Sequence, residues 1–252
     1  MLHFKDHAGD SMAFNLKDKV ALVTGAARGL GLIIAEDLAR EGVHVGGVDV
    51  RSDLLVNEMD RIGKAHDVQS MAIEADAAVE AQVEAAVTQL FARWGRIDIL
   101  INNAGVRKVA PVTEITTAMW DEIHAVNLRG QFLFTREVLK QGMLAQNEGT
   151  LIFISSGSGR RGEKNSATYC ASKFGGVGFA EAVAKDLKET RIRVTTIAPG
   201  MIWTPMAEES EVAHLDLDWL DPQHVSHAVL FCIQQDPDTI IPELHIYHRA
   251  QI

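Results

Sequence analysis

Tyr169 and Lys173 lie four residues apart in a segment with helical periodicity, so both side chains share one face of a helix. A phenol has an ordinary pKa of about 10 and is a poor acid–base catalyst at neutral pH. A lysine ammonium beside it would stabilise the phenolate and lower that pKa toward the working range. The same spacing also occurs by chance on solvated helix faces. The pair therefore indicates proton-transfer chemistry only if other polar residues accompany it.

Three other polar residues could accompany this pair in one site: Ser155, Ser156 and Asn127. The two serines follow a strand-like run at residues 150–154, and open α/β sheets build their sites at the carboxyl ends of strands. Ser156 precedes Tyr169 by 13 residues, which is enough for a loop to return to the same cleft. Ser155 is interpreted as a structural hydroxyl at the strand end. Asn127 lies inside a long helical pattern. Asparagine has a low helix propensity, so its presence there suggests a specific role.

A glycine-rich segment at residues 24–31 (TGAARGLG) joins a strand-like run to a helical pattern. Its Gly25, Gly29 and Gly31 permit a tight turn, close approach of the backbone to a pyrophosphate, and close packing of helix on strand. The N–H groups and the positive dipole end of the helix would then face the phosphates. An ordinary turn is the alternative. The strand-to-helix context favours a dinucleotide-binding site.

Asp49 ends the next strand-like run, 18 residues after Gly31. A carboxylate there can accept both ribose hydroxyls of NAD and would repel a 2′-phosphate, although it could instead cap a helix. Arg28 and Arg51 complicate the choice, because either guanidinium could hold a phosphate. On balance the sequence favours NAD over NADP. Asp76, after the third strand, is placed either to meet an adenine amino group or to cap the following helix.

These residues need a scaffold of alternating strands and helices. Strands are predicted at residues 19–23, 43–48, 68–74, 97–101, 150–154, 193–197 and 243–246. Helices are predicted at residues 30–40, 52–62, 78–93, 116–145, 168–188 and 222–234. Near-continuous apolar strands that alternate with helices indicate a parallel sheet covered on both faces. We expect an α/β fold with a single doubly wound parallel sheet, a flexible extension over residues 1–15 and one domain over residues 16–252.

The composition excludes several classes of protein. The 252 residues carry a formal net charge of −10, so the basic face of a sequence-independent nucleic-acid binder is missing. Two cysteines cannot form a disulfide framework, and no apolar run approaches the roughly 20 residues that span a bilayer. Residues 1–14 lack the apolar core of a secretory signal. His224 and His227 lack a third ligand, so no metal site is predicted, and we expect a cytoplasmic protein.

Together these motifs resemble those of the short-chain dehydrogenase/reductase family, in its compact one-domain branch. The matching positions follow the family order over residues 17–248: residues 24–31, residues 102–105 (NNAG), Asn127, Ser156, Tyr169, Lys173, Pro199, Gly200 and Thr204. The resemblance implies a Rossmann fold. It also implies an NAD(P)-dependent oxidoreductase that interconverts a secondary alcohol and a ketone, or a primary alcohol and an aldehyde.

The resemblance also implies a role for each position. Tyr169 would be the acid in reduction and the base in oxidation, while Ser156 would polarise the substrate oxygen. Lys173 would hold the nicotinamide ribose and lower the pKa of Tyr169, and Asn127 would hold a water that links Lys173 to solvent. The expected catalytic residues are thus Asn127, Ser156, Tyr169 and Lys173. The expected cofactor site comprises Gly25, Arg28, Gly29, Leu30, Gly31, Asp49, Asp76, Ala77, Asn103, Ala104, Gly105, Tyr169, Lys173, Pro199, Gly200, Ile202 and Thr204.

Substrate contacts are expected from the neighbouring loops, at Ser158, Arg107, Arg160 and Trp203. With Lys108 and Arg161, the two arginines form a basic cluster that could bind a carboxylate or phosphate, or could simply be solvated loop charges. The segment that follows Thr204 is short for a substrate cap, which suggests an open site or one completed by a neighbouring chain. We expect a homo-oligomer, either a dimer or a tetramer.

Two other functions stay open. A catalytically silent dinucleotide-binding regulator would be expected to lack catalytic residues, and none is lost here. An epimerase or dehydratase of the same fold would usually be longer, with a separate substrate domain and a different glycine spacing. Turnover of an alcohol or ketone with the free dinucleotide distinguishes an oxidoreductase from both.

Overall fold

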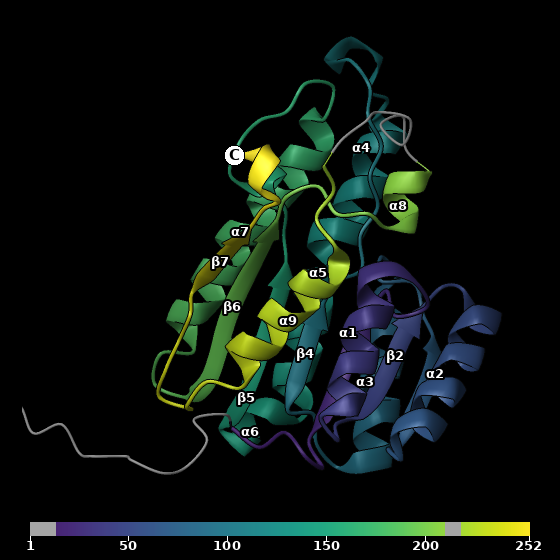
Figure 1. Cartoon of the computed structure of the whole chain (residues 1–252), viewed down its shortest axis with the longest axis vertical. Coiled ribbons are helices and arrows are strands. Elements are labelled where there is room, and N and C mark those ends of the chain that lie inside the picture. Colours follow the sequence, from purple (N-terminus) through teal and green to yellow (C-terminus); the bar gives the residue numbers. More distant parts are fainter. Residues whose placement is uncertain (1–13, 210–217) are drawn as a thin grey trace, which may run out of the picture.

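The computed structural model describes residues 14–209 and 218–252 of the chain (Figure 1). The strands in this part are β1 (Val20–Thr24), β2 (His44–Asp49), β3 (Ser70–Glu74), β4 (Ile99–Asn102), β5 (Glu148–Ile154), β6 (Arg191–Pro199) and β7 (Glu243–Ile246). The helices are α1 (Gly29–Arg40), α2 (Ser52–His66), α3 (Glu80–Trp94), α4 (Thr117–His124), α5 (Gly130–Val138), α6 (Leu144–Gln146), α7 (Ala167–Asp186), α8 (Pro205–Glu208) and α9 (Pro222–Ile233). The π-helical turns Ala125–Arg129 and Leu139–Met143 join α4, α5 and α6.

The strands form one seven-stranded sheet in the order β3-β2-β1-β4-β5-β6-β7, and every neighbouring pair is parallel. The chain builds outward from β1 to β3, returns to the centre at β4, and then builds outward to β7. The strand order therefore reverses between β1 and β4, which is where a doubly wound sheet opens a crevice for ligands. The predicted doubly wound parallel sheet is confirmed.

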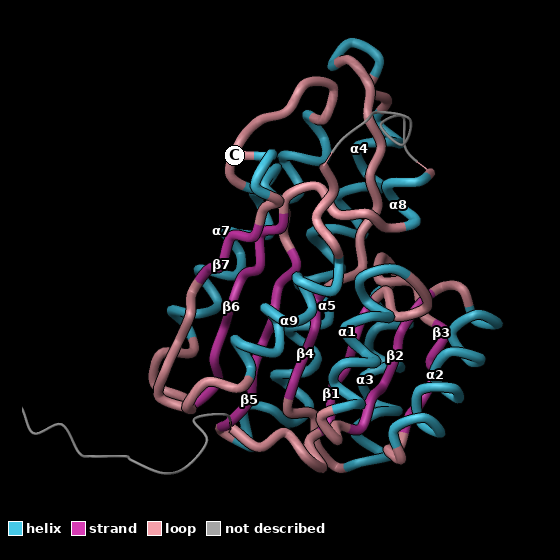
Figure 2. Tube along the Cα trace, viewed as in Figure 1, coloured by secondary structure: helices cyan, strands magenta, loops and turns pink. Residues whose placement is uncertain are grey.

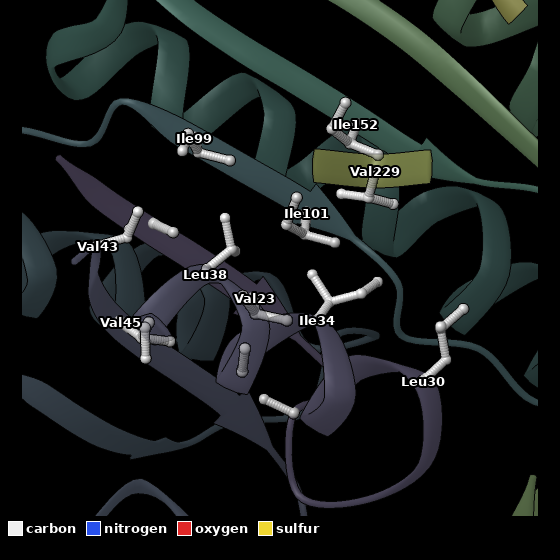
Figure 3. Packing of buried hydrophobic residues seen from close by; sticks show 14 of the residues in the cluster. Val23, Leu30, Ile34, Leu38, Val43, Val45, Ile99, Ile101, Ile152 and Val229 are labelled. Carbon is white, nitrogen blue, oxygen red and sulfur yellow. The ribbon is translucent and has the colours of Figure 1, made fainter. Parts of the chain in front are cut away.

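The five central strands, β2, β1, β4, β5 and β6, are buried on both faces, and their side chains alternate between two hydrophobic clusters. Val23 of β1 and Ile101 of β4 belong to one cluster, whereas Leu22 and Leu100 belong to the other. This alternation follows from the two-residue period of a strand. Figure 3 shows the first cluster, in which Val23 and Ile101 lie close to Ile34 of α1.

Each face of the sheet is covered by its own helices (Figure 2). The first cluster contains buried side chains from α1, α2 and α9, and the second contains side chains from α3, α5 and α7. In Figure 1, α1 and α9 lie in front of the sheet. The apolar stripe of each helix accordingly packs on the apolar face of the strands, which fixes the strand ends that carry the site.

The region predicted as one helix over residues 116–145 is a helical run with two π turns. The first π turn contains Asn127, which is fully buried. Its side-chain amide accepts a hydrogen bond from the backbone N–H of Val106 at 2.8 Å and donates to the carbonyl of Val106 at 2.9 Å. An asparagine thus stands in a helix because it holds a loop, and π turns are frequent at functional sites.

The ends of the expected domain lie partly outside the described residues. Of the expected extension, residues 1–13 are not described, while the backbone N–H of Phe14 donates to the carbonyl of Gln234 at 2.9 Å and its side chain packs on the first cluster. Of the short cap after Thr204, residues 210–217 are not described. Within residues 14–209 and 218–252, no helix combines the length and the apolar character that crossing a membrane requires.

Candidate active site

A cavity of about 260 Å³ opens at the carboxyl edge of the sheet. Each strand from β1 to β6, apart from β3, supplies lining residues at or just after its end. Examples are Gly25 after β1, Asp49 in β2, Asn103 after β4, Ser156 after β5 and Gly200 after β6. This is the crevice that the strand reversal between β1 and β4 predicts.

The glycine-rich loop forms one end of the cavity. Gly25 and Gly29 have φ values of +68° and +60°, a region that side chains rarely adopt. A Cβ on Gly31 would lie 2.1 Å from the carbonyl oxygen of Gly25, so only glycine lets α1 approach the end of β1 this closely. The loop leaves the N-terminus of α1 beside the cavity. These features fit the pyrophosphate of a dinucleotide.

Thr24 ties this loop to the loop after β4. Its hydroxyl accepts hydrogen bonds from the backbone N–H groups of Asn103 and Ala104 at 3.0 and 2.9 Å, and donates to the carbonyl of Ile101 at 3.2 Å. The amide of Asn103 donates in turn to the carbonyl of Thr24 at 2.9 Å. The two loops that flank the reversal point are therefore held in one fixed arrangement.

Asp49 lines the cavity and is buried, with both carboxylate oxygens in use. One oxygen accepts from the backbone N–H of Ala27 at 3.1 Å, and the other accepts from the backbone and guanidinium of Arg51 at 3.0 and 3.3 Å. Arg28 also lines the cavity, and its guanidinium forms a two-pronged ion pair with Glu209. Each arginine that could hold a 2′-phosphate is thus already engaged with a carboxylate.

Tyr169 also lines the cavity and is only 8% exposed. Burial raises the pKa of Tyr169 above its ordinary value. Two neighbours oppose that rise: a side-chain hydrogen bond with Ser156, and the positive charge of Arg107. The phenol therefore keeps its proton at neutral pH and can act as an acid.

Lys173 lies one helical turn further along α7 and also lines the cavity. Its ammonium donates to the carbonyl of Ile154 at 2.9 Å and lies 5.7 Å from the centre of the Tyr169 ring. Burial lowers the pKa of Lys173 to about 8. The expected lowering of the pKa of Tyr169 by Lys173 is therefore not what prevails in this arrangement, because the ammonium is directed at a carbonyl and burial dominates at the phenol.

Comparison with known proteins agrees with a site that binds a dinucleotide. The sequence profile described as short chain dehydrogenase matches residues 19–214. The chain belongs to the short-chain dehydrogenase family. Levodione reductase from Leifsonia aquatica is 39% identical over 232 residues, which covers 91% of this chain and 84% of that protein. D-threitol dehydrogenase from Mycolicibacterium smegmatis is 36% identical over 200 residues, covering 78% and 75% respectively. A crystal structure of actinorhodin polyketide ketoreductase with NADPH has a TM-score of 0.84 and 29% identity, covering 93% of this chain and 97% of that one.

As a short-chain dehydrogenase, this chain is an NAD(P)-dependent oxidoreductase. Most of the residues expected to form its site line the one cavity. They are Gly25, Arg28, Gly29, Leu30, Asp49, Asn103, Ala104, Gly105, Arg107, Ser156, Ser158, Tyr169, Lys173, Pro199, Gly200, Ile202 and Thr204. Gly31 and Asn127 lie behind this lining, where Gly31 packs on Gly25 and Asn127 holds Val106.

Besides Gly31 and Asn127, four further expected site residues do not line the cavity of this short-chain dehydrogenase. Arg160 is exposed and pairs with Glu181 and Glu243, because its loop directs it along the surface. The carboxylate of Asp76 accepts from the backbone N–H of Ala78 at 2.8 Å, which lies in the loop before α3, so Asp76 does not cap that helix; Ala77 also lies outside the lining.

The fourth is Trp203, which packs edge-on against Trp219 with 5.0 Å between ring centres. Trp219 is the tryptophan that lines the cavity. The sequence analysis missed Trp219 and also Glu163, another lining residue. The signal available for Trp219 was that it is a second tryptophan close to Thr204 in sequence. No sequence signal distinguishes Glu163 from an ordinary loop acid.

The buried Lys173 predicts a pH dependence of stability. Its pKa falls from 10.5 to about 8 on folding, so the destabilisation by the buried ammonium is complete below pH 8 and is lost above pH 10.5. Since one pH unit corresponds to about 1.4 kcal/mol, the change across this window is about 3 kcal/mol. We expect urea unfolding to show the wild type gaining that much stability relative to Lys173→Met as the pH rises. Lys185→Met, on the exposed face of α7, is the matched control, and an equal pH dependence in both variants would contradict the assignment.

Proposed function

We propose that the enzyme interconverts a secondary alcohol and a ketone, or a primary alcohol and an aldehyde, with Tyr169 as the acid and base. One observation carries the proposal: Tyr169, Ser156 and Lys173 line the same cavity as the glycine-rich loop and Asp49. A proton donor thus lies in the same crevice that fits a dinucleotide. The regulator alternative loses support, because each of the four catalytic positions carries the required residue.

In the direction of reduction, the hydroxyl of Ser156 donates a hydrogen bond to the substrate carbonyl and polarises it. Tyr169 then transfers its phenolic proton to the same oxygen, and in oxidation the phenolate takes that proton back. The nicotinamide, when bound, supplies or accepts the hydride at the substrate carbon. The raised pKa of Tyr169 suits the acid role at neutral pH.

Lys173 would hold the nicotinamide ribose hydroxyls, and Asn127 would hold a water between Lys173 and solvent. The pyrophosphate would lie on the loop of Gly25 and Gly29, with Leu30 at the start of α1. The nicotinamide would be covered by Pro199, Gly200, Ile202 and Thr204, which line the same cavity as Tyr169. Ser158 and Arg107 would face the substrate, since both line the cavity near Tyr169.

NAD is the proposed preferred cofactor. Asp49 lines the cavity with a buried carboxylate, and Arg28 and Arg51 are both paired with acids. A 2′-phosphate would therefore meet a negative charge, and the guanidinium groups of Arg28 and Arg51 each already pair with a carboxylate. The NADPH-bound ketoreductase shows that a relative of this fold takes the other cofactor, so the preference must be tested on Asp49 itself.

Asp49→Asn should weaken NAD binding and strengthen NADP binding relative to it. The charged acceptor of the ribose hydroxyls is lost and the repulsion of a phosphate falls, which together change the ratio of affinities on the order of tenfold or more. Fluorescence titration with each dinucleotide measures the ratio. Asp53→Asn, at an exposed position in the first turn of α2, is the control and should leave it unchanged. An unaltered ratio in Asp49→Asn would assign Asp49 to capping alone.

The reaction itself is tested with the purified enzyme, a panel of ketones and alcohols, and NAD and NADP in parallel. Cyclic diketones and polyols head the panel, because the relatives named above are a levodione reductase and a D-threitol dehydrogenase. Oxidation or reduction of the free dinucleotide in step with substrate supports the proposal. Binding of dinucleotide without turnover of any substrate would favour the regulator.

We also infer that the chain acts as a homo-oligomer. Trp120 of α4, Phe132 of α5 and Phe174 of α7 expose 43%, 39% and 45% of their surface. A second copy packed on these helices would cover them. We further propose that the enzyme works in the cytoplasm on a small-molecule alcohol or carbonyl compound. Residues 16–252 would form its catalytic domain.

A further inference from the structure

The basic cluster of the two active-site loops separates into paired and unpaired side chains. Lys108 pairs with Glu122, and Arg160 pairs with Glu181 and Glu243. Arg161 lies 3.9 Å from Glu163. Arg107 differs from the others, since among the described residues no carboxylate lies within ion-pair distance of its guanidinium.

Arg107 lines the cavity, and the backbone there is held through its neighbour Val106. The amide of Asn127 clamps both backbone polar groups of Val106, at 2.8 and 2.9 Å. This contact fixes the backbone from which the Arg107 side chain extends. The guanidinium carbon lies 5.9 Å from the centre of the Tyr169 ring, and both residues line the cavity. A guanidinium at this distance interacts favourably with the ring and much more strongly with a phenolate.

Lys173 is less well placed to stabilise that phenolate alone. Its ammonium is directed at the carbonyl of Ile154, and its pKa of about 8 means that it loses its charge in mildly alkaline solution. An arginine stays charged across the whole working range. Within the described part of the chain, Arg107 is therefore the member of the basic cluster without a carboxylate partner, and it is also the permanent cation beside the phenol.

Taking Tyr169 as the acid–base residue proposed above, we propose that Arg107 is a positioning residue of proton transfer: its guanidinium stabilises the anionic form of Tyr169. Arg107 thereby shares with Lys173 the role of counter-charge to the phenolate. The consequence is a larger fraction of reactive phenolate for alcohol oxidation at a given pH.

The other groups that face Tyr169 define what Arg107 must overcome. Burial and the negative charge of Glu163 raise the pKa of Tyr169, as does Cys170 beside it on α7, whereas Ser156 and Arg107 lower it. The positive charge of Arg107 and the negative charge of Glu163 thus act on the phenol in opposite directions, and the Lys173 ammonium lies 5.7 Å from the centre of its ring. Removal of the guanidinium takes away one of the two influences that lower the pKa of Tyr169, so that pKa should rise further.

The test is the pH profile of kcat/KM for oxidation of an uncharged alcohol by Arg107→Gln. We expect the midpoint of the rising limb to move up by about one pH unit, so that the rate below the midpoint falls about tenfold and recovers at high pH. Arg107→Lys should restore most of the wild-type profile. Lys108→Gln removes a charge from the same loop that is already paired with Glu122, and it should leave the profile unchanged.

A second measurement needs no turnover. The chain has two tyrosines, so in a Tyr247→Phe background the ultraviolet titration of phenolate reports Tyr169 alone. Adding Arg107→Gln should move that titration upward, whether or not the variant remains an efficient enzyme.

Three results would overturn the inference. A loss of rate that is equal at every pH would assign Arg107 to the loop's structure. An unshifted midpoint, together with a KM that rises for anionic substrates but not for uncharged ones, would assign Arg107 to substrate binding. An unchanged titration in the Tyr247→Phe background would exclude any effect on the phenol. Failure of the underlying function is a separate result, because it requires Tyr169→Phe to keep its turnover.

Discussion

Tyr169→Phe should lower the rate of both carbonyl reduction and alcohol oxidation on the order of a thousandfold, which is typical for loss of a positioned acid–base group. The substitution removes one hydroxyl and leaves the buried ring in place. The loop of Gly25, the contact between Asp49 and Ala27, and the bond from Lys173 to Ile154 do not involve that hydroxyl. Dinucleotide affinity should therefore change by no more than about threefold, which is under 1 kcal/mol.

The pH dependence of the wild-type rates tests the same role of Tyr169, because reduction and oxidation should respond to pH in opposite directions. Burial raises the pKa of Tyr169, so the protonated acid persists below that pKa and the phenolate base forms only above it. Reduction should accordingly be fastest at neutral or lower pH and should fall as the pH rises through the pKa. Oxidation should rise over the same interval. Both limbs should vanish from the residual activity of Tyr169→Phe.

Tyr247→Phe is the matched control, since it removes the same hydroxyl from the only other tyrosine of the chain. Tyr247 does not line the cavity, and its ring, which packs near Gly157 and Gly200, is retained. Steady-state kinetics and dinucleotide titration on the two variants form the experiment. Wild-type turnover by Tyr169→Phe would show that another group transfers the proton.

The parts of the site that follow from local pattern were predictable from the sequence. The alternation of side chains such as Leu22 and Val23 fixes which face of the sheet each strand residue meets, and with it the carboxyl edge where the loops gather. Four-residue spacing on one helix puts Tyr169 and Lys173 on the same side of α7. Both properties depend on the repeat of the backbone, so they survive small errors in element boundaries.

The pairing of charges was not predictable in the same way. Arg160 meets Glu243, 83 residues further along the chain, and Arg28 meets Glu209, 181 residues away. Such pairs depend on where the ends of two loops come together in space, and nothing in the local sequence specifies that. For this reason Arg160 lies outside the cavity lining, while Arg107, which was expected to contact substrate as well, lines the cavity.

The direction of the pKa of Tyr169 required the structure as well. The sequence supplies a lysine neighbour, which argues for a lowered pKa. The fold adds burial of the phenol and turns the ammonium of Lys173 toward the carbonyl of Ile154. Desolvation depends on everything that packs around a group, so it cannot be obtained from two residues and their spacing.

Among glycine-to-alanine substitutions in the glycine-rich loop, Gly31→Ala should weaken dinucleotide binding most. The new Cβ would lie 2.1 Å from the carbonyl oxygen of Gly25 and 2.5 Å from the side-chain nitrogen of Asn103. The nearer atom belongs to the backbone and cannot rotate away, so α1 must withdraw from β1 or the loop must change shape. Overpacking of this kind destabilises a protein by about 1–3 kcal/mol.

The effect on binding should exceed the effect on stability, because the same displacement moves the N–H groups at the start of α1 away from the phosphates. A misplacement of about 1 Å in a binding site can reduce function on the order of a hundredfold, and we expect the Kd for NAD to rise by about that factor. Isothermal titration measures the Kd, and urea unfolding measures the stability of the same sample. Gly178→Ala in α7 is the control, since a Cβ there meets no atom within 4 Å and alanine favours the helix by about 1 kcal/mol. Equal NAD affinity in Gly31→Ala and Gly178→Ala would mean that the close approach of α1 to β1 is not what holds the dinucleotide.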